Sequence, residues 1–258
     1  MIALSFLPYL RVLFFLPSLT LAASATTSTF TDTDTGITFQ RFFGAKTQFG
    51  FGIALPENPT TDFIGQMDFP TPANAGWGGI SLADEMVGPL LLVAWPTGNN
   101  VTSSFRLAKN EDDSPPVTTG SFAVSPIPQG TSANGTHMKF TFLCQNCIDG
   151  KLGFAAGDTN SAGFEMGWAL ASKAVKNAAD PATTLPFHNS GFETFQAQLN
   201  LARSASFGEW AAMAGVAASN GSTTPVAAAA PGSASASSFG GGDDDDDDDD
   251  DDDSDDDD

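Results

Sequence analysis

Short runs of strand-forming residues recur along most of this chain, and each run is bounded by Gly, Pro, Asn or Asp. The runs, in chain order, are GITFQRFF, FGFGIAL, TDFIGQMDF, GISLAD, PLLLVAW, SSFRLA, GSFAVSPI, HMKFTFLC, GFEMGWALA and TFQAQLNL. Many short strands without long helical patterns predict an all-β fold. We therefore expect an immunoglobulin-like antiparallel β-sandwich with a short C-terminal helix, followed by a disordered tail.

Alternation within two of these runs predicts which side chains face the core, because successive side chains of a strand point to opposite faces. In the run that begins at His137, one face carries Met138, Phe140, Phe142 and Cys144. In the run that begins at Thr194, the corresponding face carries Phe195, Ala197, Leu199 and Leu201. The later segment ASFGEWAAMAGVAA predicts the one short helix.

Residues 1–25 have the features of a secretory signal peptide. MIALSFLPYLRVLFFLPSLTLAASA is a long apolar segment that contains only Arg11 and ends in the small-x-small pattern ASA. A membrane anchor is the alternative, because the arginine lies inside the apolar region rather than before it. No other apolar segment has the roughly 20 residues needed to span a bilayer. We expect a secreted, extracellular protein with no membrane partner.

The composition changes after residue 216. Residues 26–216 are long enough for one domain with a substantial core. Residues 217–242 are mainly Ala, Ser, Gly and Pro, which predicts a flexible linker. Residues 243–258 contain 15 aspartates; the formal net charge is −21, so the rest of the chain carries only −6.

The aspartate tail is expected to stay extended and solvated, because like charges repel each other. It can serve as a solubilising segment, as a polyvalent cation binder or as a tether to basic partners. Its charge argues against nucleic acid as a partner, since the phosphate backbone is itself anionic.

The only two cysteines, Cys144 and Cys147, lie in the sequence CQNC. A second CxxC, which a zinc site would need, is absent, and a secreted chain favours oxidation. We therefore predict a local disulfide that fixes a strand end. Three N-glycosylation sequons begin at Asn100, Asn134 and Asn220 and agree with secretion.

Motifs for catalysis are missing. The chain has two histidines, His137 and His188, too few for a multi-histidine zinc or copper site. It contains no G-x-S-x-G nucleophile motif, no P-loop and no dinucleotide-binding fingerprint. Acidic groups such as Asp84/Glu85, Glu111–Asp113 and Asp62/Asp68 are more simply explained as solvated loop residues.

Met86 lies just before the apolar run PLLLVAW, where a thioether can either pack in a core or bind a metal. Five segments decide between these interpretations: TDFIGQMDFP, EMVGPLLLVAW, NGTHMKFTFLCQNC, GWALAS and LPFHNSGF, in this order. Together they resemble the extracellular cytochrome domain of fungal cellobiose dehydrogenase, a haem b-binding relative of the DOMON modules. The resemblance extends from about Phe30 to Trp210.

The resemblance implies that Met86 and His188 are the two axial ligands of one non-covalent haem b. Two such ligands saturate the iron and leave electron transfer as its chemistry, and the soft thioether favours Fe(II) and raises the potential. No CxxCH motif for covalent attachment is present. Met67 is expected inside a strand and His137 outside the ligand positions of the family.

Two features depart from the family. Its members commonly place tyrosines near the haem propionates, whereas the one tyrosine here is Tyr9. We therefore consider Arg106 as a propionate partner, and Trp95 matches a family tryptophan close to the haem. The second departure is that the linker leads to aspartates, where the family's namesake has a flavin dehydrogenase.

These expectations predict a stand-alone secreted b-type cytochrome, an electron-transfer protein that does not oxidise a sugar by itself. Its donor would be an extracellular flavin dehydrogenase or a small reductant. Its acceptor would be a copper polysaccharide monooxygenase, Fe(III) or a quinone. The alternative is a haem-free DOMON-like module for carbohydrate binding or adhesion, which predicts an exposed aromatic platform instead.

Overall fold

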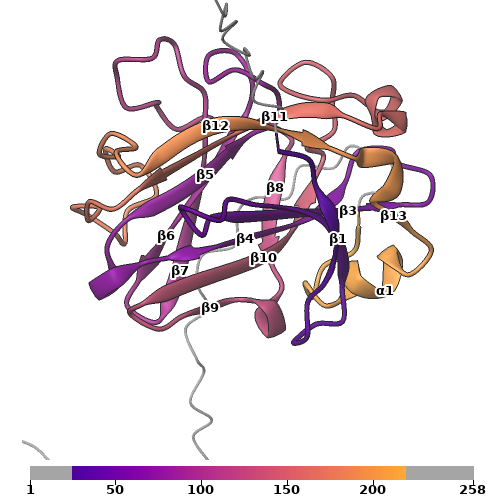
Figure 1. Ribbon diagram of the computed structural model, residues 1–258, viewed down its shortest axis with the longest axis horizontal. Coiled ribbons are helices and arrows are strands. Elements are labelled where there is room, and N and C mark those ends of the chain that lie inside the picture. Colours follow the sequence, from indigo (N-terminus) through magenta and orange to yellow (C-terminus); the bar gives the residue numbers. More distant parts are fainter. Residues whose placement is uncertain (1–24, 219–258) are drawn as a thin grey trace, which may run out of the picture. The chain divides into compact units, whose positions relative to one another are not determined.

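All ten predicted runs form strands in the computed structural model, which describes residues 25–218 (Figure 1). Three further short strands, β1, β9 and β13, have no counterpart among the predicted runs. The strands are β1 (Ser28–Thr31), β2 (Thr38–Phe43), β3 (Gly50–Pro56), β4 (Phe63–Pro70), β5 (Trp77–Ser81), β6 (Leu91–Thr97), β7 (Asn100–Arg106), β8 (Ala123–Pro126), β9 (Ser132–Ala133), β10 (His137–Gln145), β11 (Phe164–Ala171), β12 (Gly191–Ala197) and β13 (Arg203–Ser204).

The strands form two sheets that stack as layers (Figure 1). The first sheet has the order β1-β2-β3-β4-β10-β8, with β9 added to β10 and β13 to β3. The second sheet has the order β12-β11-β5-β6-β7. Every pairing between these strands is antiparallel except the short parallel contact of β13 with β3. The predicted all-β antiparallel sandwich is confirmed.

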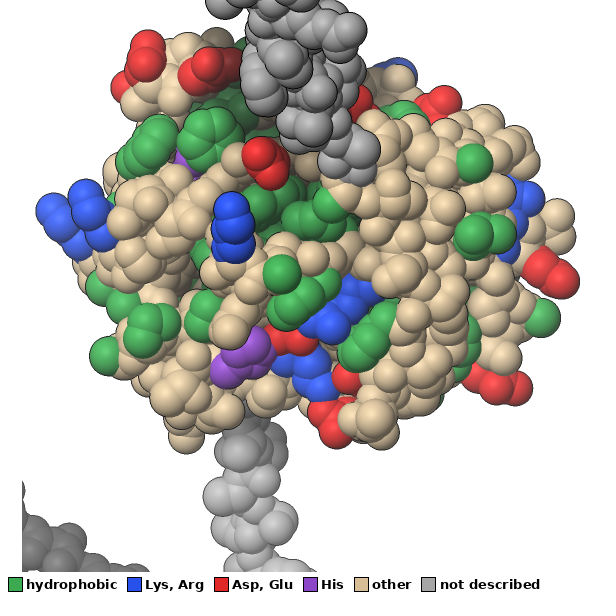
Figure 2. Space-filling model, in the orientation of Figure 1, with side chains coloured by type: hydrophobic (Ala, Val, Ile, Leu, Met, Phe, Trp, Pro, Cys, Tyr) green, Lys and Arg blue, Asp and Glu red, His purple; other side chains and the backbone are tan. Residues whose placement is uncertain are grey.

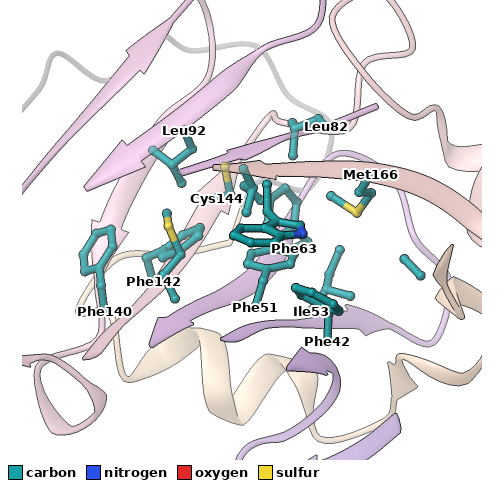
Figure 3. Close-up of a cluster of buried hydrophobic side chains, with 14 of the residues drawn as sticks. Phe42, Phe51, Ile53, Phe63, Leu82, Leu92, Phe140, Phe142, Cys144 and Met166 are labelled. Carbon is teal, nitrogen blue, oxygen red and sulfur yellow. The ribbon is translucent and has the colours of Figure 1, made fainter. Parts of the chain in front are cut away.

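Aromatic side chains from both sheets fill the space between the layers (Figure 3). The ring centroids of Phe42 and Phe195 lie 4.7 Å apart, and those of Phe49 and Trp168 lie 5.2 Å apart. Burying one such side chain contributes about 1.5–3 kcal/mol. The pairs add about 0.5–1.5 kcal/mol each. A phenylalanine-rich core therefore accounts for the cohesion of the two layers.

The alternation prediction is confirmed for β10 and is wrong at one position after β12. Met138, Phe140, Phe142 and Cys144 all belong to the core cluster. Phe195, Ala197 and Leu199 do so as well, but Leu201 is 57% exposed. The strand ends at Ala197 and a 3-10 turn covers Leu199–Leu201, so the two-residue period stops before Leu201.

The predicted helix is α1, Phe207–Ala212. It buries Phe207 and Ala211 in a second cluster with Ile37, Ile64 and Leu143, on the outer face of the first sheet. The turn after it contains Gly215 with φ +70°, a conformation that glycine adopts without strain. The helix is therefore only six residues long.

The predicted disulfide joins Cys144 to Cys147 at the end of β10. Asn146, between them, has φ +55° and donates its backbone N–H to the Asp62 carboxylate at 2.8 Å. Ile148 donates its N–H to the Thr61 carbonyl at 2.8 Å. The disulfide fixes the turn after β10, and these two hydrogen bonds hold that turn against the residues just before β4.

Several sequence predictions remain predictions. Asn100 and Asn134 are exposed, as glycosylation requires. The signal segment up to Ser24, Asn220 and the aspartate tail lie outside the described residues, as does most of the linker. No helix within residues 25–218 is long and apolar enough to cross a membrane.

Candidate haem site

A cavity of about 810 Å³ lies on the outer face of the second sheet. Alternation along the strands determines which residues line it. Leu92 and Leu170 point into the core between the sheets. Their neighbours Val93 and Ala169 point the other way and, with Gly79, line the cavity.

Small residues form the floor of this cavity. Gly79 pairs with Ala169, and Ser81 pairs with Gly167, in adjacent antiparallel strands. A Cβ added at Gly79 would lie 2.8 Å from Cγ1 of Val93, so that position tolerates no larger side chain without a shift. The result is a floor of backbone and small side chains. Its walls are apolar and come from Trp77, Leu91, Val93, Leu185 and Phe192.

Met86 reaches the cavity from the loop between β5 and β6. Hydrogen bonds fix this loop at several points: Ser81 Oγ donates to the Glu85 carbonyl at 2.6 Å, and Gly167 N–H donates to the Ala83 carbonyl at 2.8 Å. Gly88 follows with φ +107°, which turns the chain back toward β6. The half-buried thioether of Met86 is therefore held in position by its neighbours' backbone.

His188 reaches the same cavity from the loop between β11 and β12. Trp77 Nε1 donates to the Pro186 carbonyl at 2.8 Å. Ser190 N–H donates to the Leu170 carbonyl at 3.0 Å, and Asn189 Nδ2 donates to Ser172 Oγ at 2.9 Å. These bonds hold the loop on both sides of His188.

Three aromatic rings surround the His188 imidazole. Its centroid lies 4.2 Å from Phe187, 4.6 Å from Phe192 and 6.3 Å from Trp77. Burial lowers the pKa of His188, and a backbone hydrogen bond acts in the opposite direction. Its Nδ1 is buried and has no hydrogen-bond partner. A neutral imidazole with an unpartnered nitrogen is the form that binds metals.

Trp95 and Arg106 do not line the cavity. Trp95 is fully buried behind it, packs with Trp77, Val93 and Leu185, and donates its Nε1–H to the Ala178 carbonyl at 2.7 Å. It supports the floor rather than touching the cavity.

Arg106 is 1% exposed, and its guanidinium donates within the protein. Its acceptors are Ser104 Oγ and the carbonyls of Pro115, Pro181 and Thr183, at 2.6–3.0 Å. Burial lowers its pKa, and the nearby Asp180 charge raises it. Four of the five guanidinium N–H groups therefore donate to protein acceptors, and Arg106 connects two loops. Its contact with a haem propionate remains a prediction.

The competing histidine and methionine lie elsewhere. Met67 is fully buried in the core. His137 lies on β10 and pairs with Asp68, which also accepts from Arg41 at 2.7 Å. Figure 2 shows basic, acidic and histidine side chains gathered over the first sheet, in the lower part of that face. The structure thus brings Met86 and His188 together and leaves Met67 and His137 out.

The cavity fits a b-type haem by its chemistry. Its volume of about 810 Å³ is within the range of about 300–1,000 Å³ usual for ligand pockets. Its floor is formed by small and apolar residues, and a thioether and a neutral imidazole reach it from two loops. Among residues 25–218, no three His, Cys, Asp or Glu side chains form a conventional metal site.

Sequence comparison identifies the family. Residues 30–209 match the family model described as the cytochrome domain of cellobiose dehydrogenase. The chain belongs to this family. Membership implies electron transfer.

Solved structures of this family are similar to the chain. The cytochrome domain of Myriococcum thermophilum cellobiose dehydrogenase has 34% identity and a TM-score of 0.65, over 74% of this chain and 98% of that one. The cytochrome b domain of pyranose dehydrogenase from Coprinopsis cinerea has 25% identity and a TM-score of 0.64, over 75% of this chain and 98% of that one.

A curated relative is longer than the match. The pyrroloquinoline quinone-dependent pyranose dehydrogenase of Coprinopsis cinerea is 31% identical over 179 residues, which is 66% of this chain and 24% of that protein. The chain therefore matches about a quarter of that relative's length.

Sequence reasoning did not anticipate the acidic residues at this cavity. Asp84, Glu85 and Glu111–Asp113 line it, although they were expected only as solvated loop residues, and Glu193 on β12 lines it as well. They are indeed exposed. Three separate segments converge here, and nothing in the local sequence shows that they meet.

Proposed function

We propose that this chain is a secreted b-type cytochrome that relays single electrons, with Met86 and His188 as the axial ligands of one haem b. One observation carries the proposal: a thioether and an imidazole 102 positions apart in sequence reach one cavity, whose floor is formed by small and apolar residues. The haem supplies a one-electron Fe(III)/Fe(II) couple when bound.

The protein's residues would determine how that couple is used. The thioether of Met86 and the imidazole of His188 would both hold the haem iron, and a haem with two protein ligands favours outer-sphere electron transfer over oxygen binding. Burial keeps His188 neutral and ready to bind. Trp77, Leu91 and Val93 exclude water from one side, and the small floor residues leave room for a planar group.

The proposed partners are separate redox proteins. The similar proteins include a cellobiose dehydrogenase domain and pyranose dehydrogenases, which supports an extracellular dehydrogenase as the donor. The proposed acceptors are a copper polysaccharide monooxygenase, Fe(III) or a quinone.

A visible spectrum tests the proposal. The purified protein, expressed with ample haem, should show a low-spin, six-coordinate haem b spectrum when reduced. His188→Ala should weaken haem binding by at least about tenfold, since even partners behind a metal ligand contribute 10–100-fold. His137→Ala is the matched control and should retain haem. A colourless wild-type protein would favour the haem-free binding module, and haem loss confined to His137→Ala would refute the ligand assignment.

A further inference from the structure

Two large apolar side chains are exposed at the opening of the cavity. Phe187 is 61% exposed and Phe192 is 59% exposed, and both line the cavity on either side of His188. Their rings contact the imidazole, with centroids 4.2 and 4.6 Å from its centroid. Exposed aromatic residues that adjoin a functional site are typical of interaction surfaces.

Six exposed carboxylates line the same cavity as this aromatic pair, and we call them the acidic rim: Asp84, Glu85, Glu111, Asp112, Asp113 and Glu193. No lysine or arginine lines the cavity. The four ion pairs within residues 25–218 involve Asp32, Asp34 and Asp68, so none of them neutralises the rim. The opening therefore combines an apolar centre with a strongly negative margin.

The negative charge of the acidic rim indicates which kind of molecule can dock at the cavity opening. The chain's own aspartate tail would be repelled, since it carries 15 like charges. A second copy of the chain in a symmetric contact would oppose two acidic rims. A protein whose basic residues surround an apolar patch would instead match both features: its apolar patch would pack on the phenylalanines, and its basic residues would face the carboxylates.

We propose that Phe187, Phe192 and the acidic rim form the docking surface for a basic redox protein. This inference rests on the proposed function, because docking here would place the partner next to the proposed haem ligand His188. The carboxylates would accelerate encounter through long-range attraction. The two phenylalanines would form the desolvated centre of the contact.

Charge-neutralising variants of the full haem-loaded protein test the proposal, with cytochrome c as the basic probe. The rim variant is Glu111→Gln, Asp112→Asn and Asp113→Asn together. The matched control is Glu57→Gln, Asp149→Asn and Glu209→Gln, three exposed carboxylates that do not line the cavity. Both variants lose three charges, so their net charges stay equal.

Stopped-flow reduction of cytochrome c at low ionic strength should slow roughly fivefold to tenfold in the rim variant, within the 10–10³ range of electrostatic steering for a whole field. The control should change by less than about twofold, since its carboxylates steer the probe elsewhere. Equal slowing in both variants, or none in the rim variant, would overturn the assignment.

Carbodiimide cross-linking followed by peptide mapping gives a readout that needs no haem in this chain. Within the domain, lysines of cytochrome c should cross-link to the rim more often than to Glu57, Asp149 and Glu209. Cross-links spread evenly over these sites would also overturn the docking surface. Rim cross-links on a protein that binds no haem would instead refute the proposed function and leave the surface in place.

Discussion

At the scale of single residues, Met86 and His188 are constrained differently. His188 is enclosed by three aromatic rings. Met86 is a half-buried, unbranched side chain on a loop that is fixed through its neighbours. Methionine adapts to irregular surroundings because it has three rotatable bonds. The geometry of ligation would therefore depend mainly on His188, and the electronic preference on the thioether of Met86.

Met86→His should retain haem and lower its reduction potential. Imidazole stabilises Fe(II) less than a thioether does. We expect a decrease of roughly 0.1 V, a small part of the range of about 0.8 V that axial ligands span. Spectroelectrochemical titration measures it. Met67→Leu changes a core methionine away from the cavity and serves as the control; a potential that falls equally in both variants would argue against Met86 as the ligand.

At the scale of structural elements, Arg106 on β7 connects the two loops that supply one side of the cavity. Its guanidinium donates to the carbonyl of Pro115, which follows the acidic residues Glu111–Asp113. It also donates to the carbonyls of Pro181 and Thr183, which precede His188. A second link is the Leu185 N–H, which donates to Ser114 Oγ at 2.9 Å. The last residue of β7 thus helps to position the loops that carry the site.

Arg106→Met should destabilise the protein by about 2–4 kcal/mol, because buried carbonyls would lose their donor. Haem should also dissociate faster than from the wild type, since the loop before His188 would be loosened. Arg203→Met is the control: Arg203 donates to Thr159 and Asn160, which do not line the cavity. Thermal unfolding and haem transfer to apomyoglobin measure the two effects. Unchanged haem dissociation in Arg106→Met would leave Arg106 with a purely structural role.

The strands were predictable because each run carries its own signal. The period of two in β10 assigned four core residues correctly. The failure at Leu201 came from a strand end, where the backbone changes to a 3-10 turn without a Gly or Pro to mark it. β13 has only two residues and pairs with a distant strand, so it has no local signal.

Residues of the candidate site could be predicted only where they belong to a recognisable sequence motif. The resemblance named Met86 and His188, and both line the cavity. Arg106 was considered as a propionate partner because tyrosines are missing, and its carbonyl acceptors could not be foreseen because they come from distant loop residues. The acidic rim was missed because it forms from three segments that meet only after folding.

At the scale of the whole molecule, the aspartate tail carries more net negative charge than the rest of the chain. Its field is screened over about 8 Å at physiological salt. Truncation after Ala217 should therefore leave the haem spectrum and thermal stability nearly unchanged. At low salt it should slow electron exchange with cationic partners and speed exchange with ferricyanide. Stopped-flow rates across ionic strength test this; rates that match at low salt would leave the tail with only a solubilising role.

The core between the sheets is complete without the cavity. Leu92 and Leu170 face inward and pack among phenylalanines, while the cavity lies on the opposite face of the same strands. The polypeptide can therefore reach its final form empty and acquire its cofactor afterwards. Maturation would then be a loading step, and a heterologous host's haem supply, rather than its folding capacity, would set the yield of active protein.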